Sequence, residues 1–255
     1  MAHKPWTTED IPNLSGKTAL VTGANSGLGY HASLELARKG AHVIMACRTP
    51  ARAKQAYDQI LLEAPDASLE VMILDLASLA SIRAFVAAFQ EKHSRLDIQI
   101  NNAGVMAIPR KMTADGFEMQ FGTNHLGHFA LTGLLFKTTA GTTGSRIVTV
   151  SSMMHLTGVI HFDDLMGEKR YNPWLAYGQS KLANLLFAYE LQRRLAAKGY
   201  GAISLAAHPG YASTHLQFVS GEMQGSAWAK MQNQVANALL AQPAAQVGCD
   251  STIMR

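Results

Sequence analysis

Short apolar runs alternate along the chain with longer segments of helical periodicity. Six runs predict strands, at 17–22, 42–46, 69–74, 96–100, 146–150 and 202–207. Helical segments are predicted at 28–39, 51–62, 115–137 and 174–198. The apolar runs are β-branched and nearly continuous, as in parallel strands that are buried on both faces. The pattern predicts an α/β fold, with one doubly wound parallel sheet and helices on both of its faces.

The composition is that of a folded globular domain. The chain has 255 residues, of which 48% are hydrophobic and only 16% charged, and no linker interrupts it. We therefore expect one domain over 1–255 and exclude disorder. The net charge of +4 comes from scattered Lys and Arg residues, so no nucleic acid partner is indicated. Because no stretch reaches the roughly 18 apolar residues of a membrane span, we expect no membrane span and a soluble, cytoplasmic protein.

Cysteine and histidine spacing indicates no metal site. Cys47 and Cys249 lie far apart, and none of the ten histidines falls in a familiar metal-binding pattern. We interpret His125 and His128 as helix-surface or packing residues.

A glycine-rich turn follows the first apolar run. Gly23 allows a sharp turn, Gly27 allows the backbone to approach a diphosphate, and Gly29 allows the next helix to pack closely. The N-terminus of that helix would present its unpaired N–H groups to the phosphates. The same turn contributes three further candidate cofactor-binding residues, Asn25, Ser26 and Leu28. The alternative is a glycine-rich turn with only a structural role.

The end of the second run bears on the choice of cofactor. Dinucleotide folds that bind NAD often have a carboxylate here, which holds the ribose 2′-hydroxyl. In this chain the place reads Ala-Cys-Arg-Thr at 46–49, and Arg48 is a permanent cation suited to a 2′-phosphate. The residue favours NADP(H) over NAD(H), although a solvated loop arginine is the alternative.

Tyr177 and Lys181 form the sharpest chemical motif. Residues four apart share one face of a helix, so the phenol and the ammonium group would point into the same space. A nearby cation lowers the pKa of a tyrosine, which prepares it to exchange a proton with an alcohol or carbonyl oxygen. Ser151 and Ser152 end the fifth run, and a hydroxyl there would bind the substrate oxygen. Periodicity leaves open which of the two serines points inward.

Taken together, these motifs resemble the short-chain dehydrogenase/reductase family from Gly16 to about Leu216. The matching segments are TGANSGLG at 22–29, DL at 75–76, NNAG at 101–104, NHLG at 124–127, VSS at 150–152, YGQSK at 177–181 and PGYAST at 209–214. Within the family the chain is most similar to the retinol-dehydrogenase-like branch, which includes relatives of WW-domain oxidoreductases and protochlorophyllide reductases. The resemblance implies a Rossmann fold.

The resemblance also implies catalytic roles. Tyr177 would be the proton donor or acceptor, while Lys181 would hold the nicotinamide ribose and lower the pKa of Tyr177. Ser152, the second serine of the pair, would orient the substrate oxygen. Asn124 would order a helix and a water molecule that extends the proton path.

Further cofactor contacts follow from the same resemblance. Asp75 would contact the adenine amino group beside the backbone of Leu76, although Asp75 could instead be the N-cap of a following helix. The adenosine ribose and the floor of the sheet would be lined by Asn102, Ala103 and Gly104. The nicotinamide amide and the diphosphate would be fixed by Pro209, Gly210 and Thr214.

The chain departs from the family pattern in two segments. An insertion at 153–174 separates the serines from Tyr177, and we interpret it as part of a substrate wall. Family chains usually add a helix and a seventh strand after about Gln242, and this sequence reaches Arg255 midway through that helix. We therefore expect a fold that lacks the final helix and the seventh strand, with the sixth strand left at an edge.

Apolar residues near the C-terminus suggest the substrate class. A segment at about 211–242 is predicted to cover the site, with an apolar stripe of Trp228, Met231, Val235 and Leu239. The site would gain an adaptable lining from Met153, Met154, Met166 and Met223. Equally, these residues could simply pack against the sheet.

The sequence therefore predicts an NADP(H)-dependent oxidoreductase for an apolar alcohol, aldehyde or ketone. Two alternatives stay open, a C=C reductase on the same scaffold and a noncatalytic NADP(H)-binding sensor or interaction protein. The resemblance further implies a homodimer that forms through the helices around 115–137 and 174–198.

Overall fold

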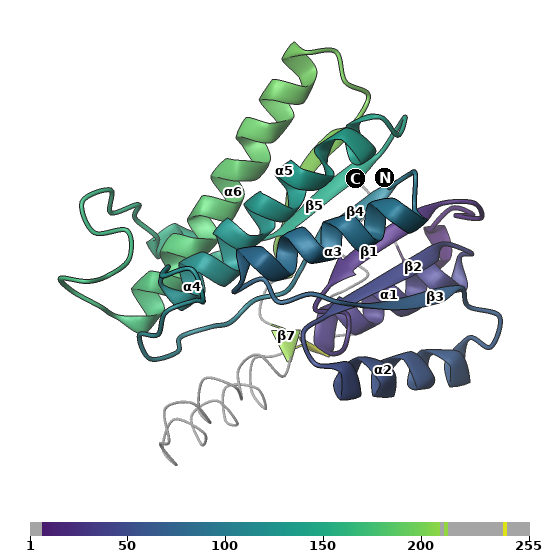
Figure 1. Cartoon of the computed structure of the whole chain (residues 1–255), viewed down its shortest axis with the longest axis horizontal. Coiled ribbons are helices and arrows are strands. Elements are labelled where there is room, and N and C mark those ends of the chain that lie inside the picture. Colours follow the sequence, from purple (N-terminus) through teal and green to yellow (C-terminus); the bar gives the residue numbers. More distant parts are fainter. Residues whose placement is uncertain (1–6, 210–211, 214–241, 244–255) are drawn as a thin grey trace, which may run out of the picture.

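The computed structural model describes residues 7–209, 212–213 and 242–243. Within these residues, six parallel strands form one sheet in the order β3-β2-β1-β4-β5-β6 (Figure 1). The strands are β1 Thr18–Thr22, β2 His42–Cys47, β3 Leu69–Ile73, β4 Ile98–Asn101, β5 Arg146–Val150 and β6 Ile203–Ala207. All six match the predicted apolar runs within two residues at either end, and the doubly wound α/β sheet is confirmed.

Helices connect successive strands. They are α1 Gly27–Arg38, α2 Pro50–Glu63, α3 Leu79–Lys92, α4 Met119–Phe121, α5 Gly127–Ala140 and α6 Pro173–Ala197. A short 3-10 helix, Thr8–Asp10, precedes the first strand, and another, Met153–Thr157, follows the fifth. A π-helix, Gly122–Leu126, joins α4 to α5 without a break.

The helix predicted at 115–137 begins later than expected. Residues Met112 and Glu118 instead form an antiparallel bridge around Gly116, whose φ is +80°. The Glu118 carboxylate then accepts hydrogen bonds from the backbone N–H groups of Gln120 and Phe121, so it acts as the helix cap. Residues 114–116, before that cap, form an exposed turn, which periodicity alone cannot distinguish from the first turn of a helix.

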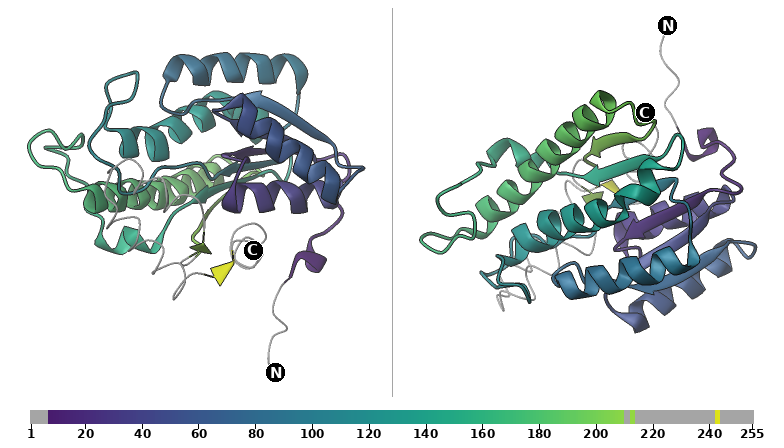
Figure 2. Two further views of the ribbon diagram at one scale, coloured as in Figure 1. Left: turned by 90° about the horizontal axis from the view of Figure 1, so that it is seen from below. Right: turned by 45° about the horizontal axis from the view of Figure 1, so that its top comes forward.

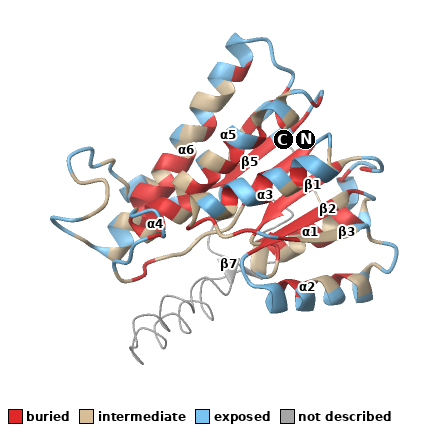
Figure 3. Ribbon diagram, in the orientation of Figure 1, coloured by how far each residue is buried: buried red, intermediate tan, exposed pale blue. Residues whose placement is uncertain are grey.

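The central strands β1, β2, β4 and β5 are buried on both faces, and Figure 3 shows them in red. Alternate residues of one strand enter different cores, so Ala19 and Val21 pack with α1 and α2 while Leu20 packs with α3 and α5. The helices therefore form a layer on each side of the sheet (Figure 2). On the second side α6 lies beside α5, where the rings of Phe129 and Phe187 are 5.5 Å apart.

Strand order determines where a ligand can enter. Strand β1 pairs with β2 on one side and β4 on the other, and the chain reverses its direction of travel across the sheet at that point. In doubly wound sheets the crevice beyond the carboxyl ends of the strands opens at such a reversal. The candidate site described below lies there.

Two short strands, β7 Ala212–Ser213 and β8 Gln242–Pro243, pair in parallel as a separate small sheet. Most of the predicted cover at 211–242, together with Gly210 and Thr214, lies outside the described residues, as do the positions where a final helix and seventh strand were considered. Of the helices in the described part of the chain, none combines the length and the hydropathy needed to cross a membrane.

Candidate active site

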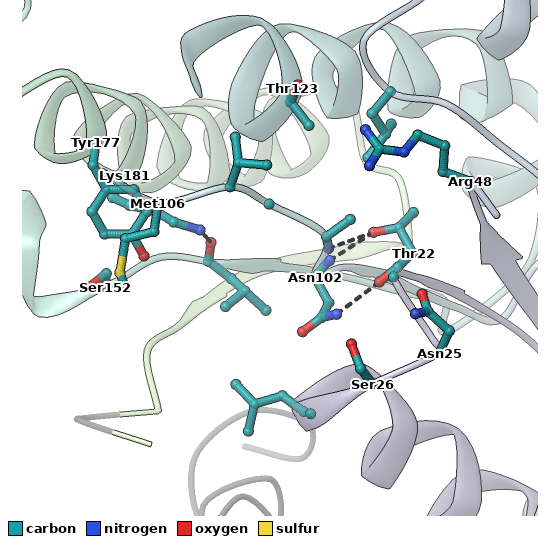
Figure 4. Close-up of a pocket in the computed structure, with 18 of the residues that line it drawn as sticks. Thr22, Asn25, Ser26, Arg48, Asn102, Met106, Thr123, Ser152, Tyr177 and Lys181 are labelled. Carbon is teal, nitrogen blue, oxygen red and sulfur yellow. Dashed lines mark hydrogen bonds between the residues drawn. The ribbon is translucent and has the colours of Figure 1, made fainter. Parts of the chain in front are cut away.

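A cleft of about 420 Å³ opens at the carboxyl ends of the central strands. Tyr177, Lys181 and Ser152 gather at one end of it and Arg48 lies at the other, with Asn102 between them and with Asn25 and Ser26 nearer the Arg48 end (Figure 4). The lining includes most of the predicted residues, namely Gly23, Asn25, Ser26, Gly27, Leu28, Arg48, Asp75, Leu76, Asn102, Ala103, Gly104, Ser152, Tyr177, Lys181 and Pro209. Gly29 and Asn124 are not among the lining residues, and each packs against residues that are.

The glycine turn depends on missing side chains. Gly23 has a φ of +67°, and a Cβ there would lie 3.0 Å from the Cα of Ala103. A Cβ on Gly29 would lie 2.3 Å from the carbonyl oxygen of Gly23, closer than any two such atoms can approach. Helix α1 therefore begins directly against the turn, as predicted from the glycine spacing.

The N-terminus of α1 faces the cleft. Its N-cap residue, Ser26, makes no side-chain hydrogen bond to the first turn of the helix. The backbone N–H groups of that turn therefore remain available, and they carry the partial positive charge of the helix dipole. The glycines of the turn leave this part of the cleft free of side chains, so that it fits a diphosphate.

A hydrogen-bond network fixes the floor of the cleft. The Thr22 hydroxyl accepts bonds from the backbone N–H groups of Asn102 and Ala103, at 2.9 and 3.0 Å. The side-chain amide of Asn102 donates to the Thr22 carbonyl at 2.8 Å. Beneath them, the Nε2 atom of His128 lies 2.9 Å from the Thr22 hydroxyl, and burial lowers the pKa of this histidine to about 4. His128 is thus a packing residue, as predicted, and it ties α5 to the ends of β1 and β4.

Two arginines lie at the far end of the cleft. Arg48 follows β2 directly, and Arg52 enters the same lining from the first turn of α2. Both are exposed, so their guanidinium groups can meet an anion in solution. Sequence reasoning identified Arg48 alone. The Thr-Pro that begins α2 at 49–50 marks a helix start, and this would have placed Arg52 on the same side.

Asp75 does not cap the following helix. Its Oδ1 atom accepts a hydrogen bond from the backbone N–H of Ala77, at 2.9 Å. The N-cap of α3 is Ser78, whose hydroxyl accepts from the N–H of Ser81. The N-cap alternative for Asp75 is therefore wrong, because the chain makes a local turn at Asp75 before the helix begins. Asp75 itself lines the cleft beside Leu76.

Helix α6 carries Tyr177 and Lys181 into the cleft. Asn172 caps the helix by accepting from the N–H groups of Trp174 and Leu175, and Pro173 occupies its first position. Tyr177 and Lys181 are 4% and 3% exposed, and they share one face, as their spacing predicted. The Lys181 Nζ atom lies 5.6 Å from the centre of the Tyr177 ring and donates to the Val150 carbonyl at 3.0 Å.

Burial dominates the electrostatics of this pair. It raises the pKa of Tyr177 to about 12, and only a hydrogen bond with Ser152 opposes the rise. Burial also lowers the pKa of Lys181 to about 8. The expected lowering of the Tyr177 pKa is not borne out for the protein chain alone, because loss of solvation sets the direction of the shift and outweighs the hydrogen bond with Ser152. At neutral pH the phenol keeps its proton.

The two serines have different partners. The Ser151 hydroxyl donates to the Lys181 carbonyl at 2.8 Å, which binds the end of β5 to α6. Ser152 caps the 3-10 helix Met153–Thr157 by accepting from the N–H of Met154, and its hydroxyl also bonds with Tyr177. The question left open by the sequence is thereby answered, since Ser152 is the serine that faces the phenol.

Asn124 stands behind the cleft, in the π-helix. Its Oδ1 atom accepts from the N–H of Val105, and its Nδ2 atom donates to the Val105 carbonyl and to the Ser180 hydroxyl. A Cβ on Gly104 would lie 3.0 Å from that Oδ1 atom, so Gly104 makes the close approach practicable. Asn124 thus joins the loop after β4 to the helix that carries Tyr177 and Lys181.

Apolar side chains line the cleft near Tyr177. Met153 and Met154 are among them, as predicted, together with Met106 and Trp174, which the sequence did not single out. Met166 was expected in this lining, and the expectation is wrong because its sulfur accepts a hydrogen bond from the N–H of Glu118. The stripe at 228–239 and Met223 lie outside the described residues.

The amino-acid sequence is similar to those of known short-chain dehydrogenases and retinol dehydrogenases. The family model described as short chain dehydrogenase matches residues 17–225. Human retinol dehydrogenase 13 is 50% identical over 204 residues, and mouse retinol dehydrogenase 14 is 49% identical over 213 residues. Each match covers 80% of this chain, and this chain spans 61% and 63% of the lengths of those two relatives.

Solved structures agree in fold. An uncharacterised protein from Mycobacterium paratuberculosis superposes with a TM-score of 0.75 at 47% identity, covering 94% of this chain and 81% of that one. A short-chain dehydrogenase from Sphingobium yanoikuyae, solved in complex with NADPH, gives a TM-score of 0.69 at 20% identity, covering 91% of this chain and 81% of that one. The second likeness bears on the fold alone.

Proposed function

The chain belongs to the short-chain dehydrogenase family, and from that premise we propose that it is an NADP(H)-dependent oxidoreductase that interconverts an alcohol and a carbonyl compound. One observation carries the proposal. A buried phenol and a buried ammonium group meet a half-buried serine hydroxyl at one end of a cleft whose other end presents a glycine turn and two arginines. Such a cleft suits a dinucleotide, with its reactive ring beside a proton donor.

The residues along the cleft support cofactor binding. The α1 N-terminus and the turn from Gly23 to Gly29 would hold the diphosphate. Asp75 and Leu76 would flank the adenine, while Asn102, Ala103 and Gly104 would line the floor. When bound, the nicotinamide supplies or accepts the hydride.

The chain's own residues handle the proton. In the direction of reduction, the Tyr177 phenol donates its proton to the carbonyl oxygen of the substrate, and Ser152 orients that oxygen through its hydroxyl. The raised pKa of Tyr177 keeps the proton in place at neutral pH until the oxygen becomes basic enough to take it. Lys181, with a pKa of about 8, is mostly charged at neutral pH and stabilises the phenolate as it forms. Oxidation of the alcohol reverses these steps.

The lining favours an apolar substrate. Met106, Met153, Met154 and Trp174 surround the end of the cleft that holds Tyr177, and thioether side chains adapt to irregular apolar shapes. The curated relatives are retinol dehydrogenases. Both observations support a retinol-type alcohol, or the corresponding aldehyde, as the substrate class.

A substrate screen tests the proposal. We expect NADPH to be consumed, as followed by its absorbance, when apolar aldehydes and ketones that include a retinoid aldehyde are supplied. Tight NADPH binding without turnover would contradict the proposed enzyme and support a noncatalytic sensor. Turnover confined to conjugated ketones, with the carbonyl left intact in the product, would support a C=C reductase.

Arg48 should determine the preference for NADP(H). Arg48→Asp removes a cation that can bond the 2′-phosphate and introduces a carboxylate that can bind a ribose 2′-hydroxyl. Hydrogen bonds to charged groups contribute about 1.5–3 kcal/mol, so NADPH affinity should fall roughly 10- to 100-fold while NADH affinity holds or improves. Fluorescence titration with both cofactors measures this, and Arg83→Asp, on the exposed side of α3, is the control. Tighter binding of NADH than of NADPH by the unaltered protein would contradict the argument.

A homodimer remains part of the proposal. The outer faces of α5 and α6 expose large apolar side chains, which include Phe129, Leu186 and Tyr189. Adjacent exposed apolar residues on two helices are typical of protein interfaces. They support association through the helices suggested by the sequence.

A further inference from the structure

Three potential metal ligands meet away from the cleft, at the amino ends of two neighbouring strands. His42 is the first residue of β2, Glu70 is the second residue of β3, and His93 is the C-cap of α3. Glu70 pairs in register with Ile44, so His42 and Glu70 lie on the same face of neighbouring strands. That face packs against α3 through Ile44, Met72 and Phe89. The fold therefore converges these side chains at the amino ends of the strands, whereas the cleft lies at the carboxyl ends.

The distances suit a single small cation. The Nε2 atom of His93 lies 3.0 Å from the Oε2 atom of Glu70, and the Nε2 atom of His42 lies 3.7 Å from the same oxygen. All three ligand atoms lie within 4.8 Å of one another. Ligands bonded at about 2.0–2.1 Å to a tetrahedral Zn²⁺ are separated by roughly 3.3 Å. Small side-chain adjustments would therefore close the site around an ion.

Outer contacts already orient these side chains. The Nδ1 atom of His42 lies 2.7 Å from the Ser68 hydroxyl, and Lys92 donates to the Oε1 atom of Glu70 at 2.7 Å. The His93 ring packs on Phe89, with the ring centres 5.0 Å apart. Each contact uses an atom or a face other than the one that points into the cluster. This is the arrangement in which an outer partner fixes the tautomer of a histidine and the direction of a carboxylate that bind a metal.

We propose that His42, Glu70 and His93 bind one Zn²⁺ ion, with water as the fourth ligand. Two imidazoles and one carboxylate are ligands that zinc accepts readily, whereas Mg²⁺ and Ca²⁺ prefer oxygen alone. The side chains of the three residues are 32%, 22% and 14% exposed, in sequence order, so the ion can enter from solvent yet sit mostly inside protein. Bound there, it would tie β2, β3 and α3 together. No short Cys/His motif announces the site, because its ligands come from three separate elements.

Calorimetric titration with ZnCl₂ tests the proposal on protein whose purification tag has been removed. We expect one ion per chain at pH 7.5, and much weaker binding at pH 5.5, because protons compete with a metal ion for its ligands as the pH falls. His42→Asn and His93→Gln should each weaken binding by more than the roughly 10- to 100-fold that loss of an outer partner costs, and Ser68→Ala by about that amount. His161→Gln, on an exposed histidine, is the matched control and should change nothing.

Two further measurements keep the test decisive. Circular dichroism and NADPH titration verify that the variants fold, because the proposed zinc ligands lie outside the cleft. X-ray absorption at the zinc edge of the unaltered protein needs no variant, and it should show two imidazoles at about 2.0 Å. Absence of binding, binding that survives both histidine substitutions, or a spectrum without imidazole scattering would each overturn the proposal.

Discussion

Tyr177→Phe is expected to lower turnover by about 10²- to 10⁴-fold, the usual contribution of a positioned proton donor. The substitution keeps the aromatic ring, which fills a site that is only 4% exposed, and removes the hydroxyl alone. No other group in the described lining combines a transferable proton with contact to Ser152. The loss should therefore appear in kcat, while the affinity for NADPH stays nearly unchanged.

The matched control for this substitution is Tyr189→Phe. Tyr189 lies on the same helix, twelve residues further on, and is 64% exposed. Steady-state kinetics with a substrate identified by the screen should show full activity for Tyr189→Phe. Equal turnover by Tyr177→Phe and the unaltered protein would remove the phenol from the mechanism. A circular dichroism spectrum like that of the unaltered protein would show that Tyr177→Phe folds, so that its loss of activity is chemical. The bond that the Ser152 hydroxyl accepts from the Met154 N–H does not involve Tyr177.

The sheet was predictable because its strands are chemically uniform. A parallel strand covered on both faces needs an apolar side chain at nearly every position, so runs such as 42–46 and 146–150 stand out without any alignment. The start of the helix region at 115–137 was not predictable in the same way. Its beginning depends on the Glu118 carboxylate folding back onto two backbone N–H groups, a local competition that apolar periodicity does not record.

The candidate site was predictable where its chemistry is local in sequence. Tyr177 and Lys181 lie one helical turn apart, and Gly23 and Gly29 belong to one turn, so spacing alone brings them together. Met106 and Arg52 enter the cleft from a loop and a neighbouring helix, and their position depends on tertiary packing. The direction of the Tyr177 pKa shift also required burial to be known, because desolvation raises this pKa and outweighs the opposing hydrogen bond with Ser152.

Lys181→Met is expected to stabilise the cofactor-free protein while abolishing its activity. A buried lysine whose pKa is about 8 in the folded chain, against 10.5 as its ordinary value, binds fewer protons when folded than when unfolded. The unfolded chain is therefore favoured by protonation, and this penalty is fully present below about pH 8 and disappears as the pH rises toward 10.5. At neutral pH it amounts to about 3 kcal/mol. Methionine keeps the length and apolar stem of the side chain, and Asn184 still donates to the Val150 carbonyl.

Thermal unfolding across pH separates this effect from ordinary packing changes. The melting temperature of Lys181→Met should exceed that of the unaltered protein at pH 7, and the difference should shrink toward pH 10.5. Lys198→Met, at the exposed C-cap of the same helix, should show no such pH-dependent difference. A variant less stable than the unaltered protein at pH 7 would contradict the argument from desolvation. A stable variant without turnover would mean that the chain sacrifices stability to keep an ammonium group beside Tyr177, which is the cost expected of a functional rather than a structural charge.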